Sequence, residues 1–396
     1  MKNTLFLALL FLGIGCLAPA VSAQSGRRAQ PVSKPTTPVV TSDDSDFSES
    51  KPSSGPIYSK KIRAAQTAER DKPVPKPDET VTDSGEDSVI RVGTELVTVP
   101  VSVYERSGVY VSGLRRSDFR IYENGSEQEI AYFGTTEVPF TVVLLVDVSG
   151  STDRKIGQIQ SAALSFIQNL KPNDRVSIVE FSSGINTLCD FTTDRMVLEK
   201  AISKLRSGGG TVLYDAVERV LKRSFKGVEG RKAVVLFTDG VDTSGNSNGY
   251  EKTLALAEEG DAAVYSVYYN TYLEMRGINT GQGPMSGIPD ISRAPNIPGM
   301  RPEDYARGRA YLEELARITA AKMFRSDSTS GGLNAAFAGI ADELGNQYSI
   351  GYYPKEPGAT GQRKQIKVRV ARPNVGVRAR DSYIVGEALQ TKKAGT

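Results

Sequence analysis

Apolar and polar residues follow two different periods in the middle of this chain. Four short runs are almost continuously apolar, which is typical of strands buried on both faces of a sheet; they are FTVVLLVDV, RVSIVEF, KAVVLFTD and AAVYSVYYN. Between and after them, apolar residues recur at the spacing of helices with one buried face. These helical stretches follow Asp153, Thr193 and Leu213, and occur again over 304–318 and 333–344. The pattern predicts an α/β domain over residues 139–345, with a doubly wound, mostly parallel sheet covered by helices on both faces.

The segment before this domain, residues 88–138, has a period of two. In ELVTVPVSVY every second residue is a valine, so one face of a strand is expected to be buried there. Further along, Asn124-Gly125 lies between two strand-like runs, and this pair is the strongest short signal for a hairpin. The segment is therefore expected to be rich in β-structure.

The segment after the domain, residues 346–387, contains three more strand-like runs. In the middle run, Lys367 and Arg369 alternate with apolar residues and are expected on the solvent face of a strand. Neither flank has enough strands to form a two-sheet sandwich by itself. We therefore expect the two flanks to pair with each other, so that the α/β domain is an insertion in a β-sandwich.

Three further segments lack both periods. Residues 24–87 are rich in Pro, Ser, Thr, Asp and Lys, and such a stretch buries too little apolar surface to offset its ordering entropy, so we expect a disordered linker. Residues 271–302 are rich in Gly, Pro and Ile and are too long for an ordinary loop. This insertion follows a predicted strand, so it should emerge at the carboxyl edge of the sheet. Residues 388–396 are expected to form a tail.

The N-terminus has the pattern of an export signal. A positively charged start precedes the apolar run LFLALLFL, and the small residues of APAVSA suit cleavage after Ala23. We therefore expect residues 1–23 to be a signal peptide, and the protein to reach the periplasm, the cell surface or the medium with no membrane span in the mature chain. The alternatives are lipid attachment at Cys16, which the glycine three residues before it disfavours, and an uncleaved anchor helix.

Composition removes several classes of function. The chain of 396 residues contains no histidine, which excludes Ser-His and Cys-His catalysis and the histidine-containing zinc sites. With 49 basic and 46 acidic residues, the formal net charge of +3 gives no reason to expect a nucleic-acid partner. The chain has two cysteines, so once a signal peptide is removed Cys189 has no internal disulfide partner and is expected to be a small buried apolar residue.

Polar oxygens gather where predicted strands end. DVSGS follows the first apolar strand and presents Asp147, Ser149 and Ser151 at alternate positions, while Asp239 ends the strand KAVVLFTD. Thr211 follows three glycines, which allow close backbone approach, and precedes a predicted helix. Ligands of open parallel sheets bind outside the carboxyl ends of the strands, so these side chains are expected to meet. Carboxylates and hydroxyls suit a hard cation, Mg²⁺ first and Mn²⁺ or Ca²⁺ as alternatives.

Each of these signals has an ordinary alternative. Asp and Ser at a strand end are common helix caps, and TDG is a common turn. Their occurrence together, in order, within one alternating α/β pattern favours a shared metal site over coincidence. Two carboxylates and neutral hydroxyls leave such an ion with room for an anionic ligand from outside.

The combination resembles the metal-ion-dependent adhesion site of von Willebrand factor A (VWA) domains. The match consists of D-x-S-x-S after an apolar strand, a Gly-Gly-Thr loop and T-D-G at a later strand end, within about residues 138–345. The resemblance implies that Ser149, Ser151 and Thr211 bind the ion directly, that the aspartates act partly through water, and that an acidic residue of a partner completes the shell. The flanks are similar to exported bacterial proteins called VWFA-related, common in acidobacteria. The 271–302 insertion and the long leader depart from the VWA pattern.

Two classes of function follow from these features. The first is a binding module outside the cytoplasm that holds a protein or another anionic ligand through a divalent cation. The alternative is a structural or assembly component of the cell envelope without a metal-dependent ligand. An enzyme would need a general base, and in a chain without histidine no paired set of carboxylate, lysine or tyrosine side chains stands out. We therefore expect no catalytic activity.

Overall fold

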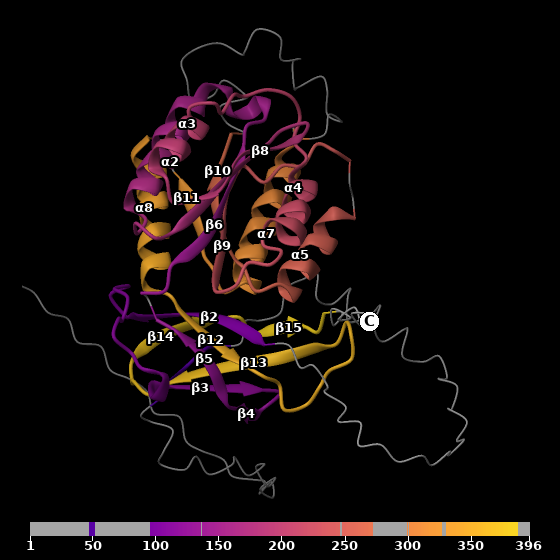
Figure 1. Cartoon of the computed structure of the whole chain (residues 1–396). Helices are drawn as coiled ribbons and strands as arrows, with labels where there is room; N and C mark the ends of the chain where they lie inside the picture. Colours follow the sequence, from indigo (N-terminus) through magenta and orange to yellow (C-terminus); the bar gives the residue numbers. More distant parts are fainter. Residues whose placement is uncertain are drawn as a thin grey trace, which may run out of the picture. The chain divides into compact units, whose positions relative to one another are not determined.

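The computed structural model describes residues 47–51, 96–135, 137–245, 248–271, 299, 301–326 and 330–386. The expected signal peptide, most of the linker, most of the 271–302 insertion and the C-terminal tail lie outside these residues. The described residues form an α/β domain and a β-sandwich (Figure 1), which belong to one compact unit within residues 44–396.

The α/β domain is built on a six-stranded sheet with the strand order β11-β10-β9-β6-β7-β8. All neighbours in it are parallel except β7 and β8, which pair antiparallel. The mostly parallel sheet predicted from the apolar runs is confirmed. The strands are β6 (Phe140–Asp147), β7 (Arg175–Phe181), β8 (Ile185–Thr192), β9 (Arg231–Thr238), β10 (Ala263–Tyr269) and β11 (Met323–Ser326).

Helices cover both faces of this sheet (Figure 1). On one face lie α2 (Ile156–Asn169), α3 (Arg195–Ile202) and α8 (Ser330–Asn346); on the other lie α4 (Leu213–Arg219), α5 (Gly249–Glu259) and α7 (Pro302–Ile318). All eight residues of β6 are buried, so a layer of helices must cover each face of the sheet at this strand. Leu144 packs in the first core and Leu145 in the second, as the alternation of side chains along a strand requires.

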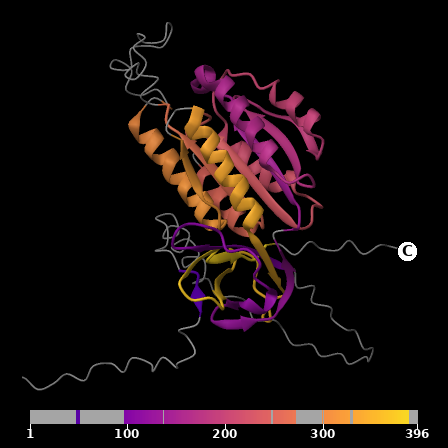
Figure 2. The same ribbon diagram turned by 90° about the vertical axis from the view of Figure 1, so that its left-hand side faces the viewer.

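The two β-rich flanks combine into one sandwich, as predicted. One sheet has the order β14-β2-β12-β5, and the other has the order β1-β13-β3-β4 with β15 beside β13. Figures 1 and 2 show these strands gathered together, apart from the helices. The strands are β1 (Ser48–Glu49), β2 (Val97–Glu105), β3 (Phe119–Glu123), β4 (Ser126–Gln128), β5 (Ile130–Gly134), β12 (Tyr348–Tyr352), β13 (Arg363–Val370), β14 (Val375–Ala379) and β15 (Ser382–Ile384). The α/β domain is therefore an insertion between strands that pair with each other.

The predicted hairpin at Asn124-Gly125 is also confirmed. Glu123 of β3 pairs with Ser126 of β4, which leaves Asn124 and Gly125 as a two-residue turn. Both turn residues have positive φ, 48° and 88°, the conformation that the Asn-Gly pair favours in such hairpins.

Two sequence-based expectations need correction. The disordered linker expected over residues 24–87 includes Ser48 and Glu49, which pair antiparallel with β13. Cys189 is only partly buried, against the edge of the first core. Lys367 and Arg369, in contrast, lie on the partly exposed face of β13 as predicted, where Glu49 lies 2.7 Å from Lys367 Nζ and 3.1 Å from Arg369 Nε.

Two elements, α5 and β11, were not predicted. The helix α5 contributes only two fully apolar core side chains, Leu254 and Ala257, and β11 is four residues long, so neither produces a clear period. Within the part of the chain that the structure describes, every helix is too short or too polar to cross a lipid bilayer.

Candidate metal centre

Three loops at the carboxyl edge of the six-stranded sheet carry the five predicted metal ligands. Asp147 ends β6, and Ser149 and Ser151 follow in the loop and in the short 3₁₀ helix η2 (Gly150–Lys155). Thr211 lies just before α4, and Asp239 directly follows β9. Because β6 and β9 are adjacent and parallel, Asp147 and Asp239 leave the sheet at the same edge.

Backbone hydrogen bonds join the loop after β6 to the glycine-rich loop before α4. The N–H of Gly150 donates to the carbonyl of Gly209 over 3.1 Å, and the N–H of Gly208 donates to the carbonyl of Val148 over 2.8 Å. Gly209 has a φ of +78°, and a Cβ at this position would lie 2.3 Å from Ser183 Oγ. The left-handed φ therefore favours glycine at this position, and the missing side chain leaves room for Ser183 from the turn between β7 and β8.

Ser151 connects the first loop to the third. Its hydroxyl donates to Asp239 Oδ2 over 3.0 Å and lies 3.1 Å from the hydroxyl of Ser149. Both Ser149 and Asp239 are buried. Three of the five predicted ligands thus form one continuous hydrogen-bonded cluster.

Asp147 lies at the base of this cluster and is completely buried. Its Oδ1 accepts a hydrogen bond from the backbone N–H of Ser149 over 2.9 Å, and its Oδ2 accepts one from the hydroxyl of Thr238 over 2.6 Å. These two donors fix the orientation of the carboxylate. The hydrogen bond from the N–H of Ser149 to the side chain of Asp147, two residues earlier, forms a local turn. This turn accounts for the spacing of Asp147 and Ser149 in DVSGS.

Thr211 is buried and is positioned through its backbone. Its N–H donates to Thr243 Oγ1 over 2.8 Å, and its carbonyl accepts from the N–H of Thr243 over 2.9 Å. Thr243 belongs to the loop after β9, the same loop that carries Asp239. The glycine-rich loop is therefore hydrogen-bonded to both other loops: Gly209 joins it to the loop after β6, and Thr211 joins it to the loop after β9.

The electrostatics of the two carboxylates favour a cation. Burial, and then the charge of Asp239, raise the pKa of Asp147 from 3.8 to about 7. Burial likewise raises the pKa of Asp239, although hydrogen bonds from Thr271, Val241 and Ser151 and the charge of Lys155 act in the opposite direction. Two buried carboxylates that repel each other gain most from a positive charge placed beside both.

The donor set fits a hard divalent ion. Carboxylate and hydroxyl oxygens are the groups that Mg²⁺ and Ca²⁺ prefer, and Mg²⁺ commonly uses only one or two carboxylates. The described residues contain no group of three or more Asp, Glu, Cys or His side chains placed to hold a metal.

Several residues that organise the centre were missed by the sequence interpretation. Thr271, the second residue after β10, donates to Asp239 Oδ2 over 2.7 Å, and its hydroxyl lies 3.1 Å from that of Tyr305 in α7. Thr238 could have been found, because it stands next to Asp239 in a strand whose end was already singled out. Tyr305 left no local signal, because its role depends on how α7 packs.

The helix α7 packs closely against the loop after Asp239, and two glycines make this approach possible. Gly240, directly after Asp239, has a φ of +80°, and a Cβ there would lie 2.7 Å from the carbonyl carbon of Gly308. A Cβ on Gly308 would in turn lie 2.3 Å from the carbonyl oxygen of Gly240. The glycine of T-D-G is therefore needed for close packing against α7 as well as for the turn.

Comparison with known proteins finds matches to the α/β domain. Residues 142–241 match the von Willebrand factor type A domain family, and this range includes all five predicted ligands. This part of the chain is thus similar to a VWA domain, as the motif indicated. A solved von Willebrand factor type A protein from Catenulispora acidiphila is 12% identical, with a TM-score of 0.40 over 75% of this chain and 76% of that chain.

The similarity to curated proteins is partial. An uncharacterized protein of Synechocystis sp. is 26% identical over 165 residues, which cover 40% of this chain and 39% of that protein. Inter alpha-trypsin inhibitor heavy chain 4 of Mus musculus is 31% identical over 122 residues, which cover 27% of this chain and 13% of that protein. The chain therefore spans about two fifths or less of the length of these relatives.

Proposed function

We propose that the VWA domain is a binding module that holds Mg²⁺, or in its place Mn²⁺ or Ca²⁺, and through it an acidic residue of a protein partner. The ion would be held by Asp147, Ser149, Ser151, Thr211 and Asp239. The observation that carries the proposal is the cluster in which Ser151 bridges Ser149 and Asp239 beside the buried Asp147. A bound ion would place positive charge beside two buried carboxylates whose pKa values burial raises.

The residues of this chain have distinct parts in that function. Thr238 and the N–H of Ser149 orient Asp147, and Thr271 orients Asp239, so that both carboxylates are preorganised. The neutral hydroxyls add oxygen ligands without adding negative charge. The bound ion keeps enough positive charge to attract an anionic ligand from outside.

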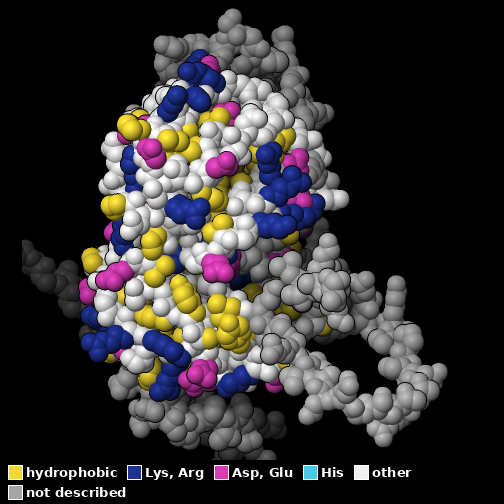
Figure 3. Space-filling view, viewed as in Figure 1, with side chains coloured by type: hydrophobic (Ala, Val, Ile, Leu, Met, Phe, Trp, Pro, Cys, Tyr) yellow, Lys and Arg dark blue, Asp and Glu magenta, His cyan; other side chains and the backbone are white. Residues whose placement is uncertain are grey.

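The partner is proposed to be a protein rather than nucleic acid. On the face seen in Figure 3, Lys and Arg side chains are interspersed with Asp and Glu side chains, and no single basic field covers it. Such a surface does not resemble the basic stripe of a nucleic-acid-binding protein. The N-terminal export pattern supports an encounter outside the cytoplasm, and no catalytic role is proposed.

A metal-dependent stability measurement tests the site directly. Adding MgCl₂ to the chelator-treated protein should raise its melting temperature, because an ion that binds only the folded state stabilises it. In Asp147→Ala this response should disappear, whereas Asp190→Asn, which alters an exposed carboxylate on β8, should keep it. Equal responses in Asp147→Ala and the unaltered protein would refute the metal site.

Partner binding needs a second measurement. Capture of envelope proteins on the immobilised chain should occur in Mg²⁺ and stop in excess chelator or with Asp147→Ala. If the melting temperature responds to Mg²⁺ but capture does not, the ion is structural and the protein is an envelope component without a metal-dependent ligand.

A further inference from the structure

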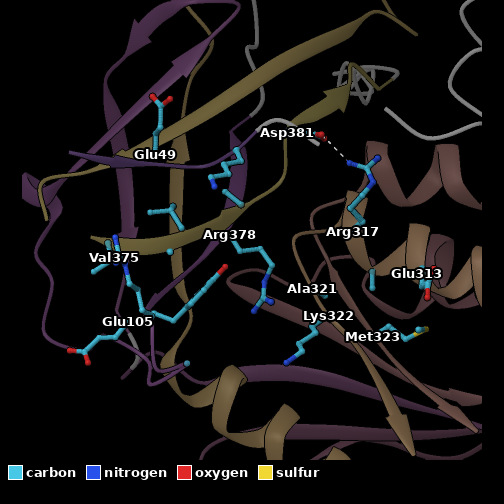
Figure 4. Close-up of a pocket in the computed structure, with 18 of the residues that line it drawn as sticks. Glu49, Glu105, Glu313, Arg317, Ala321, Lys322, Met323, Val375, Arg378 and Asp381 are labelled. Carbon is cyan, nitrogen blue, oxygen red and sulfur yellow. Dashed lines mark hydrogen bonds and ion pairs between the residues drawn. The ribbon is translucent and has the colours of Figure 1, made fainter. Parts of the chain in front are cut away.

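A cavity of about 860 Å³ lies between the α/β domain and the sandwich and shares no lining residue with the metal centre. Figure 4 shows the side chains that surround it, with Val375 and Arg378 from β14, and Arg317, Lys322 and Met323 from α7, the turn after it and β11. Its volume is within the range of ligand-binding clefts. Two features of its walls indicate what it accommodates.

The first feature is a free strand edge. Among the strands that the structure describes, β14 is the outermost of its sheet and pairs only with β2, with Val377 opposite Val103. The carbonyl of Val103 accepts a hydrogen bond from the N–H of Val111 over 2.8 Å, so the backbone groups of Val103 point away from β14. In an antiparallel ladder, residues opposite each other either exchange both hydrogen bonds or neither. The N–H and C=O of Val377 therefore point away from β2.

The same alternation applies to Val375 and Ala379. The N–H of Val375 is used, because it donates to Ser48 Oγ beside β1 over 3.2 Å. For the N–H and C=O of Val377 and Ala379, the residues that the structure describes provide no partner. Both residues line the cavity, so its wall presents unpaired backbone donors and acceptors to whatever enters.

The opposite wall includes a second strand edge. β11 is the outermost strand of the six-stranded sheet, and the carbonyl of Lys322, just before it, accepts from Ser266 of β10 over 3.4 Å. The backbone groups of Met323 and Arg325 alternate with that of Lys322 and so face away from β10. Met323 and Arg325 also line the cavity, which therefore lies between two strand edges that carry no second neighbouring strand within the described residues.

The second feature is an excess of unpaired cations. Arg317 is paired with Asp381, Arg325 with Glu313, and Arg378 with Glu343. Three further cations line the cavity without forming an ion pair among the described residues: Lys51, Arg106 and Lys322. Of the carboxylates that line the cavity, Glu105 alone forms no ion pair within the same described residues. Arg106 donates only to the amide oxygen of Asn374, and Lys322 Nζ lies over the ring of Phe324. The cavity therefore favours an anionic occupant.

We propose that this cavity binds an extended acidic segment of a partner protein, which adds as a strand to the free edge of β14. Its backbone would pair with Val377 and Ala379, and its carboxylates would face Arg106 and Lys322. A small anion would use the cations but leave the strand edge unpaired. The chain itself contains an example of this mode, since β1 adds to β13 and places Glu49 between Lys367 and Arg369.

A defined peptide tests this proposal on the full chain. The probe is a fluorescent hexapeptide of alternating valine and glutamate, blocked at both ends, and its anisotropy is followed in excess chelator so that the metal centre cannot contribute. Binding should weaken about tenfold or more in the double variant Arg106→Gln, Lys322→Gln, because two charge-assisted contacts are lost. Lys226→Gln, which alters an exposed lysine outside the cavity, should bind the peptide as the unaltered protein does.

The requirement for strand addition has its own control. The same peptide with an N-methyl group on every backbone amide keeps its charge but has no backbone donor for strand pairing, so it should bind about tenfold more weakly or worse. Equal binding of the methylated peptide, or of the peptide to the double variant, would overturn the proposal. So would absence of binding up to about 1 mM peptide. Self-association that is lost in Lys322→Gln would instead assign the cavity to a second copy of the chain.

Discussion

The hydroxyl of Ser151 donates a hydrogen bond to the carboxylate of Asp239 over 3.0 Å, although the two residues are 88 positions apart in the sequence. The contact exists because β6 and β9 are neighbours in the sheet and run parallel, with Val146 opposite Phe237. Their carboxyl ends therefore coincide, and the loops that follow can exchange hydrogen bonds. Each prediction about the centre depends on this placement.

The stability of the metal-free protein should depend on pH in an unusual direction. Burial and the charge of Asp239 raise the pKa of Asp147 from 3.8 to about 7, so over this interval the folded state retains a proton that the unfolded chain releases. The free energy of unfolding in excess chelator should therefore fall as pH rises from about 4 to about 7. Urea titrations at several pH values measure it. Asp147→Asn should show a shallower fall, and a metal-free stability that increases over this interval would contradict the assignment.

Ser151→Ala should weaken Mg²⁺ binding while preserving the fold. The substitution removes one proposed oxygen ligand and the hydrogen bond to Asp239, and a loss of about 10–100-fold in metal affinity is expected. Calorimetric titration with MgCl₂ gives the affinity, and circular dichroism checks the fold. Ser203→Ala, at the exposed end of α3, serves as the control and should bind Mg²⁺ normally. An unchanged affinity in Ser151→Ala would remove Ser151 from the ligand set.

Gly308→Ala should destabilise the protein despite the better helix propensity of alanine. The new Cβ would lie 2.3 Å from the carbonyl oxygen of Gly240, so α7 and the loop after Asp239 must separate, at a cost of about 1–3 kcal/mol. Gly157→Ala in α2 is the matched control, because a Cβ there meets nothing within 4 Å. That control should gain up to about 1 kcal/mol. Urea unfolding distinguishes the two, and equal effects would show that α7 does not pack tightly against this loop.

Residues 88–138 should not fold as a separate unit. Both neighbours of β2, the strands β12 and β14, come from the C-terminal flank, and β3 pairs with β13 of the same flank. The isolated segment would expose its valine face to water, which removes the main favourable term for folding. An NMR spectrum of the segment should show poorly dispersed amide signals. Well-dispersed signals would mean that this flank is a domain by itself.

The sequence alone determined the architecture and the three segments of the centre. Continuous apolar runs indicate strands buried on both faces, and helical spacing between them requires helices above and below, so the sheet and its carboxyl edge follow from periodicity. The position of Asp147, Ser149 and Ser151 follows in turn, because polar oxygens directly after a buried strand must emerge at that edge. The pairing of the two flanks could also be predicted, since neither contained enough strands to cover its own apolar face.

The tertiary structure alone decided which distant groups meet. Thr271 reaches Asp239 only because β10 lies beside β9, and Tyr305 reaches Thr271 only because α7 packs against β10. Gly308 is required only because α7 approaches Gly240. Glu49 pairs with Lys367 and Arg369 through a two-residue strand too short to produce any period. Local patterns record which side of an element is buried, whereas contacts across long sequence separations depend on packing between elements. The outer edge of β14 likewise depends on tertiary structure, because it is the order of the described strands in the sheet that leaves this edge without a neighbouring strand.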